Sequence, residues 1–184
     1  SYDAWIVKTN SKGDLLWERS IGGSAYDIAH AIIENRKGEY VVLGQSFSQD
    51  RDIEKPLGSS DMFLSILSPS GELKSSKNIG NKGFDTGKAL IERPDGTLIL
   101  LGHTAPETLA AEENFLSNNV FIAHTLPNGN VIKQYKLIGD GLDLGHDITQ
   151  LEGGKTIVIG TTESSSGDYP VSQGGKDIFL AIWH

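Results

Sequence analysis

The sequence predicts an all-β fold made of short antiparallel strands, and three observations support this prediction. Like residues recur every 58 positions of the 184-residue chain: Asp3, Asp61 and Asp177 share one frame, which Asn119 continues. Within each unit, four runs rich in β-branched and aromatic residues alternate with turns that contain glycine. A unit of four short strands at this period is typical of propeller blades. We therefore expect propeller-type, four-stranded antiparallel blades.

The repeat covers the chain as one region, residues 1–184, with frames of about 3–60, 61–118 and 119–176 and the start of a further frame at 177–184. The chain thus holds three 58-residue repeats plus an overlapping strand. Propellers have about four to eight blades, so three blades do not close a ring. An open arc would leave apolar blade faces bare, which soluble proteins rarely tolerate. We therefore expect the chain to pair with further blades of the same protein or with a second copy, and both chain ends to be cut from something longer.

The first part of the pattern is a hairpin. A strand over residues 3–9 is followed by a turn at 10–13 that ends on glycine, and a second strand begins at Leu15. The same pattern places equivalent turns at 68–71 and 126–129. Because the glycine of each turn keeps the frame, we expect the turn geometry to repeat as well.

Two further strands joined by a tight turn complete each unit. A link that contains glycine, and then an aromatic residue or Leu followed by Asp, leads into the first of them. The second is the most apolar run of the unit and ends on a glycine. The expected strands are 31–33 and 40–43, 89–91 and 98–101, and 148–149 and 156–159, with Gly44, Gly102 and Gly160 after the second strand of each pair. Only Pro106–Leu116 has a composition that favours a helix.

Composition excludes several classes of protein. The formal charge is -8, from 16 basic and 24 acidic residues, and no basic run occurs, so we expect no nucleic-acid partner. The absence of cysteine excludes disulfides and thiolate metal sites. Apolar runs such as Leu98–Leu101 are far shorter than the ~20 residues of a membrane helix, so we expect no membrane insertion.

Aspartates recur at two frame positions. One interpretation is a ring of carboxylates that binds a metal or sugar hydroxyls. The favoured interpretation is that each Asp caps a turn by accepting backbone N–H bonds at the same place in every blade, since a single active site needs no copies. The residues are Asp3, Asp61 and Asp177 at one position and Asp27, Asp85 and Asp143 at the other.

Basic residues recur at a third position. His30 and His146 share a frame, and Lys88 occupies the same frame between them. If the strand that starts at 31 lines a central channel, these side chains form a partial ring that binds a carboxylate or phosphate and titrates near neutral pH. The alternative is a surface position whose side chains share only their register. His103 and His124 lack a partner at metal-binding spacing, and we expect them to be satisfied structural histidines.

A calcium site is a weaker candidate. Asp50 and Asp52 lie close together in a loop, and Asp168 occupies the frame of Asp52. Closely spaced loop carboxylates supply the oxygen ligands that Ca²⁺ needs. The second unit has Thr108 and Ala110 in this region, so a solvated polar loop is the favoured interpretation.

Trp17 is a candidate platform for stacking on a sugar ring, because Trp5 and Trp183 fall in or near the register of the core strands. No nucleophile elbow, Ser/His/Asp order or metal-hydrolase motif is visible, and we expect no catalytic residue.

The pattern Gly-Gly-x-x-x-Asp, then a strand, Gly-Glu-Tyr-Val-Val-x-Gly-x-Ser and Gly-x-x-Asp-x-Phe/Trp-Ile/Leu resembles the bacterial β-propeller repeats of secreted and surface-anchored proteins. The third unit, from Ile159 to Pro170 and from Gly175 to Phe179, is similar to that repeat at several positions. The resemblance covers nearly the whole chain. It implies the fold and an extracellular or cell-surface location, and it implies no particular activity.

The leading hypothesis is a non-catalytic binding or interaction module with a protein or glycan partner. The segments 45–60, 103–118 and 161–176 differ strongly while the framework keeps its register, as in a scaffold with exchangeable loops. One alternative is a polysaccharide-active enzyme or lectin with its site at the mouth of the channel. The other is a structural spacer or adhesin repeat.

Overall fold

The computed structural model describes residues 1–105, 117–169 and 174–183, and in these ranges the chain forms strands and no helix. None of the described residues therefore belongs to a helix long and apolar enough to cross a membrane. The segment with helix-favouring composition, Pro106–Leu116, lies outside the described residues. The strands are β1 (Ala4–Thr9), β2 (Leu15–Ile21), β3 (Asp27–Glu34), β4 (Tyr40–Ser46), β5 (Asp61–Leu67), β6 (Leu73–Ile79), β7 (Phe84–Glu92), β8 (Leu98–Ala105), β9 (Asn119–Thr125), β10 (Val131–Leu137), β11 (Asp143–Gln150), β12 (Thr156–Thr162) and β13 (Asp177–Trp183).

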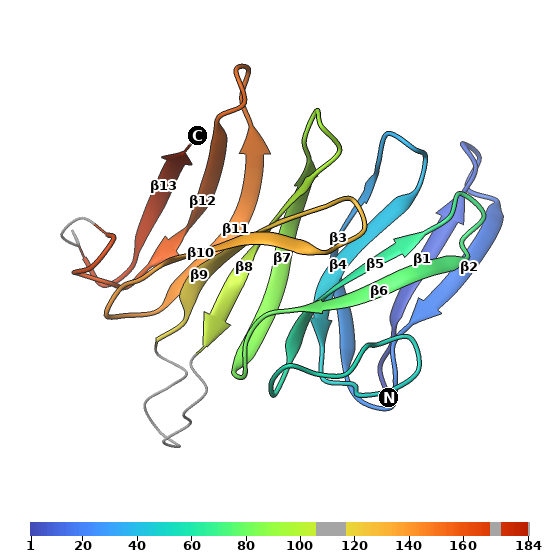
Figure 1. Cartoon of the computed structure of the whole chain (residues 1–184), viewed down its shortest axis with the longest axis horizontal. Coiled ribbons are helices and arrows are strands. Elements are labelled where there is room, and N and C mark those ends of the chain that lie inside the picture. The colour runs from blue at the N-terminus through green and yellow to red at the C-terminus, as the bar shows by residue number, and fades with distance from the viewer. Residues whose placement is uncertain (106–116, 170–173, 184) are drawn as a thin grey trace.

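The strands form four antiparallel sheets, each in chain order. We call β1–β2 the leading pair, β3–β6 the first blade, β7–β10 the second blade and β11–β13 the trailing sheet. Figure 1 shows these sheets side by side, from the leading pair at one end to the trailing sheet at the other. The predicted fold class is confirmed: the protein is all-β, with four-stranded antiparallel sheets arranged like propeller blades.

A backbone hydrogen bond joins each sheet to the next at the same place in the repeat. The N–H groups of Asp27, Asp85 and Asp143 donate to carbonyl groups one or two residues before β1, β5 and β9, at 2.7, 2.9 and 2.7 Å. The acceptors are Tyr2, Ser60 and Asn118. These aspartates therefore lie at the beginning of a strand, and β11 is longer than the expected segment 148–149.

The core lies between the sheets, because the third strand of a blade presents alternate side chains to its two neighbours. Phe63 and Phe121 are 0% and 1% exposed and pack towards the preceding sheet. Met62 and Leu64 are 0% and 1% exposed and pack towards the following blade. Each four-stranded blade therefore needs a neighbour on both sides to bury its apolar residues.

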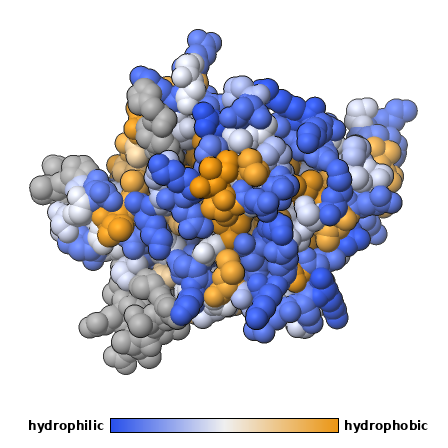
Figure 2. All heavy atoms as spheres, in the orientation of Figure 1, coloured by the Kyte–Doolittle hydropathy of each residue, from blue (hydrophilic) through white to orange (hydrophobic). Residues whose placement is uncertain are grey.

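The two end sheets lack one of these neighbours among the described residues. Trp5, in the frame of Phe63, is 65% exposed on the leading pair. Ile178 and Leu180, in the frames of Met62 and Leu64, are 77% and 60% exposed on the trailing sheet. The face seen in Figure 2 is mostly hydrophilic and is interrupted by apolar patches. At these repeat positions the side chains are buried in the two blades. On the leading pair and the trailing sheet, the apolar side chains at the same positions are exposed.

Candidate functional site

The basic residues predicted as a channel ring lie at equivalent irregularities in three successive sheets. β3, β7 and β11 are each the first strand of their sheet, and each contains a shift in its pairing with the next strand. His30, Lys88 and His146 are the residues that these shifts leave without a register partner. A β-bulge of this kind adds one residue to a strand and redirects its side chain.

The repeated glycine opposite each bulge explains why the irregularity recurs. A Cβ on Gly44 would lie 2.0 Å from the carbonyl oxygen of Ile28, two residues before the bulged His30. The corresponding distance at Gly102 is 1.8 Å, from the carbonyl oxygen of Thr86. No side chain can occupy these positions without moving the first strand. The glycines recognised in the sequence therefore let the bulged strand approach, and the bulge places the basic residue.

The structure brings two of the three predicted ring residues into direct contact. The Lys88 Nζ atom lies 3.3 Å from the His30 Nε2 atom, across the junction between the two blades. His146 lies one sheet further on, where its Nε2 atom is 3.1 Å from the Thr161 Oγ1 atom. Because a neutral imidazole has one nitrogen with a free lone pair, His30 can accept a hydrogen bond from the Lys88 ammonium.

His103 belongs with these three residues. The sequence analysis did not predict this fourth member. Burial is the largest cause that lowers the pKa of His103, and together with the positive charges of Lys88, His146 and His30 it brings this pKa to about 4. Its Nδ1 atom is buried and has no hydrogen-bond partner among the described residues. It is thus not the satisfied structural histidine expected from the sequence. The available signal was its place in β8 directly after the repeated Gly102.

We call His30, Lys88, His103 and His146 the basic cluster. Burial lowers the pKa of His30, and the neighbouring Lys88 lowers it as well. Burial also lowers the pKa of Lys88. The groups that act on His103 are all bases, so protonation of one member opposes protonation of the others. An anion placed among them would reverse this effect and favour the charged forms.

Asp27 and Asp85 act as the turn caps that the sequence predicts. Asp27 accepts a hydrogen bond from the Gly23 backbone N–H at 2.8 Å, and Asp85 accepts one from the Asn81 N–H at 2.7 Å. In the trailing sheet Asp143 accepts bonds from the hydroxyls of Thr162 and Ser164, at 2.5 and 2.8 Å, and Asp27 accepts the equivalent bonds from Ser46 and Ser48. These carboxylates are 0 to 2% exposed and fix the links between sheets.

Burial raises the pKa of three of the repeated aspartates. It is the largest cause for Asp61, Asp85 and Asp143, and hydrogen bonds to each carboxylate oppose it. Asp61 accepts its bonds from the backbone N–H groups of Leu57 and Gly58, at 2.8 and 3.1 Å. All three groups therefore have local partners that explain their burial.

The three calcium candidates point to local partners as well. Asp52 forms an ion pair with Arg19 at 3.0 Å, and Asp50 accepts a bond from the Ser24 backbone N–H at 2.7 Å. Asp168 accepts a bond from the Ile138 N–H at 2.8 Å. Over the described residues, no group of three or more potential ligand side chains is arranged to hold a metal ion.

Trp17 is packed between sheets and does not form an open platform. Its ring lies edge-on to Tyr40 with centroids 5.5 Å apart, and its Nε1–H donates to the Pro69 carbonyl oxygen at 3.1 Å. The turn at 68–71 covers it from the first blade. His124 fits its expectation, because its Nε2 atom lies 3.0 Å from the Thr97 hydroxyl.

No protein-family model matches the chain, and no curated protein matches it. The site is therefore interpreted from its own geometry.

Proposed function

We propose that the protein is a non-catalytic binding module whose basic cluster takes an anionic group, a carboxylate or a phosphate. The observation that supports this most directly is the contact of 3.3 Å between Lys88 Nζ and His30 Nε2, and the buried Nδ1 atom of His103, which has no partner among the described residues, adds to it. Bases gathered in this way destabilise one another's charged forms when no anion is bound. A bound oxyanion supplies acceptors for their N–H groups.

The binding step needs only proton uptake and hydrogen bonding. The Lys88 ammonium donates a charge-assisted bond to an oxyanion, and such bonds are shorter and stronger than neutral ones. The nearby negative charge raises the pKa of His30 and His103 towards or above the usual histidine value. The imidazoles then donate where they previously could not, so binding becomes tighter as the pH falls.

The resemblance to bacterial surface repeats supports an extracellular or cell-surface setting for this module. A propeller framework that keeps its register while its connecting segments vary suits the presentation of loops to a protein or glycan partner. In this setting the anionic group belongs to the partner, for example as a uronic acid or an acidic side chain.

The test is a titration of the ¹⁵N-labelled protein with acetate and with inorganic phosphate, followed by NMR. We expect amide shifts at His30, Lys88 and His103, and an affinity about tenfold weaker in Lys88→Met, since a hydrogen bond to a charged group contributes about 1.5 to 3 kcal/mol. Lys12→Met, in an exposed turn, is the matched control. Unchanged affinity in Lys88→Met and in the double variant His30→Ala, His146→Ala contradicts the proposal.

A second candidate is a structural repeat segment, and the exposed end faces favour it. Ile178 and Leu180 of the trailing sheet are apolar at positions that are otherwise buried against a following blade. The first blade of a second copy offers that surface, with β13 taking the place of the copy's own β1. Phe179 matches Phe63 and Phe121 at the central position, whereas β1 carries the larger Trp5.

Sedimentation of the 184-residue chain tests this candidate. We expect a species of twice the chain mass that dissociates in Ile178→Asp. A monomer that melts cooperatively contradicts the candidate and leaves the anion proposal intact.

A further inference from the structure

Two junctions between sheets are related by the repeat and differ at the frame position of Trp17, among others. At the junction of the leading pair and the first blade, the turn at 68–71 lies over the ring of Trp17. A Cβ on Gly71 would come within 2.7 Å of that ring, so the ring and turn are in close contact. The Trp17 Nε1–H donates to the Pro69 carbonyl oxygen. An indole therefore fills this junction.

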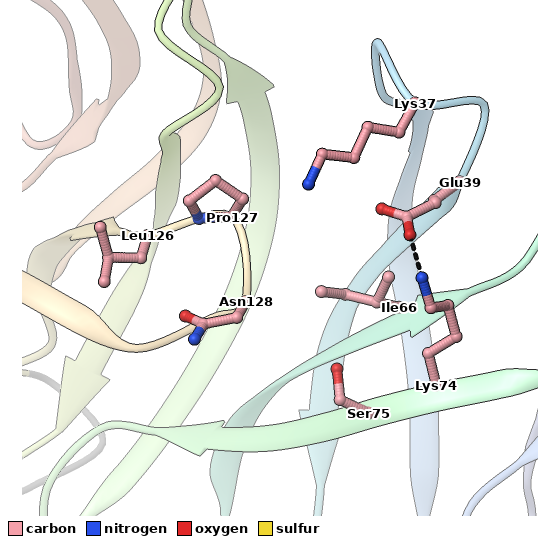
Figure 3. A pocket seen from close by; sticks show the side chains of 8 residues that line it. All are labelled: Lys37, Glu39, Ile66, Lys74, Ser75, Leu126, Pro127 and Asn128. Carbon is pink, nitrogen blue, oxygen red and sulfur yellow. Dashed lines mark hydrogen bonds and ion pairs between the residues drawn. The ribbon is translucent and has the colours of Figure 1, made fainter.

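At the next junction Lys77 and Leu64 lie beside the equivalent turn glycine, Gly129, and the space next to them is open. Ser75 of β6 holds the frame of Trp17, and Pro127 holds the frame of Pro69. Between them lies a groove of about 410 Å³, lined by residues of both blades. Figure 3 shows Ser75 and Ile66 on one side of it and Leu126 and Pro127 on the other. The volume falls within the range of about 300 to 1,000 Å³ that is usual for small-molecule sites.

We propose that this groove, which we call the Ser75 groove, binds the indole ring of a small molecule that carries a carboxylate. The protein itself offers a guide to the binding mode, because Trp17 holds the frame of Ser75 one blade earlier and donates to Pro69, which holds the frame of Pro127. The indole N–H of the ligand donates a hydrogen bond to the Pro127 carbonyl oxygen, as Trp17 does to the Pro69 carbonyl oxygen.

The lining of the groove fits a flat apolar ring. Ile66 and Leu126 supply apolar contact from the first and second blade, and Leu126 is 43% exposed. Ser75 is small, so its side chain leaves the space that an indole needs. An aromatic ring that enters removes this apolar surface from water and gains contact on both sides.

The positive charge of the groove favours a ligand that carries a carboxylate beside its ring. Lys37 and Lys74 line the groove together with Glu39. The Lys74 ammonium forms an ion pair with Glu39, and this contact is the largest cause that lowers the Glu39 pKa. Two ammonium groups thus meet one carboxylate, and one positive charge is in excess. Figure 3 shows Lys37 reaching into the space from the β3–β4 turn. A ligand carboxylate placed there is attracted to Lys37.

The Ser75 groove shares no residue with the basic cluster, so this inference goes beyond the proposed function and does not depend on it. The cluster lies on β3, β7, β8 and β11. The groove is lined from the β3–β4 turn, β5, β6 and the β9–β10 turn. An indole carboxylate can therefore be tested while the basic cluster is left unchanged.

The experiment is an NMR titration of the ¹⁵N-labelled chain with N-acetyl-L-tryptophan. We expect a dissociation constant on the order of 0.1 to 1 mM, from the usual binding free energy per ligand atom. The amides of Lys37, Ser75 and Asn128 should shift in a saturable way. N-acetyl-L-tryptophanamide, which lacks the carboxylate, should bind about threefold to tenfold more weakly, and N-acetyl-L-phenylalanine, which lacks the N–H, more weakly again.

Two variants make the result decisive. Ser75→Trp places an indole in the groove from the protein side and should abolish the shifts, as Trp17 does at the first junction. Lys37→Met keeps the groove open and should remove the preference for the carboxylate over the amide, even if Ser75→Trp does not fold. Shifts that do not saturate, or that persist unchanged in Ser75→Trp, overturn the proposal.

Discussion

The two blade junctions show how one backbone pattern produces different surfaces. Gly71 and Gly129 end equivalent turns, and both have a φ of 85°. The turn at Gly71 lies against the ring of Trp17, whereas a Cβ on Gly129 would meet Lys77 and Leu64, at 3.1 and 3.2 Å. The backbone geometry is therefore repeated, and the side chains that meet at each junction, Trp17 against Ser75 above all, decide how the junction is filled.

The same lesson holds for the frame position after each repeated glycine. The Gln45 side chain donates to the Ser60 hydroxyl at 2.8 Å, so the first blade has a neutral, paired group there. The second blade has His103 at this position, with a buried Nδ1 atom that has no partner in the described part of the chain. One substitution in the frame thus changes a paired amide into a titratable group.

Removal of the filled junction should have the largest effect. We expect Trp17→Ala to lower the free energy of unfolding by about 3 kcal/mol, because truncation of a packed Trp loses apolar contact and leaves a cavity. Urea denaturation measures this change. Lys133→Ala, at the third position of the same frame and exposed on β10, is the control and should change stability by less than about 0.5 kcal/mol. Equal effects at both positions would show that Trp17 does not hold the junction together.

Exchange of the second-blade histidine for the first-blade residue should change the pH dependence of stability. His103 has a folded-state pKa of about 4 against 6.5 in the unfolded chain, so the unfolded state binds the proton first as the pH falls. Stability is then lost as the pH falls from 6.5 towards 4, by about 2 kcal/mol between pH 7 and pH 5 for this group alone.

His103→Gln should remove that share of the pH dependence. Lys88, His30 and His146, whose charges act on His103, are present in both proteins. The raised pKa values of Asp61, Asp85 and Asp143 act in the opposite direction, so the difference between wild type and variant is the quantity to compare. Thermal unfolding at a series of pH values measures it. Parallel curves for the two proteins would contradict the assignment of His103 as the buried, unpaired base.

Alanine in place of the two turn glycines should separate backbone strain from ring contact. Both residues have positive φ, so each substitution should cost about 1 kcal/mol in backbone strain alone. At Gly71 the added Cβ also meets the Trp17 ring at 2.7 Å. We expect Gly71→Ala to be more destabilising than Gly129→Ala by about 1 kcal/mol, as an overpacked site is. The difference should vanish in a Trp17→Ala background, which chemical denaturation of the four variants tests.

Filling the open junction should have the smallest effect, and in the opposite direction. We expect Ser75→Trp to raise the free energy of unfolding by about 0.5 to 1 kcal/mol, because the new ring gains partial burial against the β9–β10 turn. Ser75→Ala leaves the groove empty and serves as the control. A destabilisation in Ser75→Trp would show that the Ser75 groove is narrower than the space around Trp17.

The strands and the 58-residue repeat could be predicted because they depend on local sequence patterns. The apolar runs along 62–67 and 120–125 and the glycine at the end of each turn identify hairpins without knowledge of the partner strands. The caps Asp27 and Asp85 followed from the same reasoning, since a side chain that serves the local backbone recurs with that backbone.

The contacts across junctions could not be predicted in the same way. Trp17 was a candidate for an open platform, yet it packs under a turn 52 residues away in the chain. His103 was expected to be satisfied locally, yet its surroundings come from Lys88, His30 and His146 on three different strands. Both depend on how neighbouring sheets meet, which the periodicity of one unit does not contain.

By itself the sequence therefore determined the architecture: strand positions, turn geometry and the frame that places His30, Lys88 and His146 at equivalent sites. These follow from local backbone preferences that a 58-residue repeat copies from unit to unit. Only the tertiary structure decided that Lys88 contacts His30, that His103 joins them and that Ser75 leaves a groove where Trp17 leaves none. These outcomes depend on side chains from adjacent sheets, whose size and charge vary while the backbone repeats.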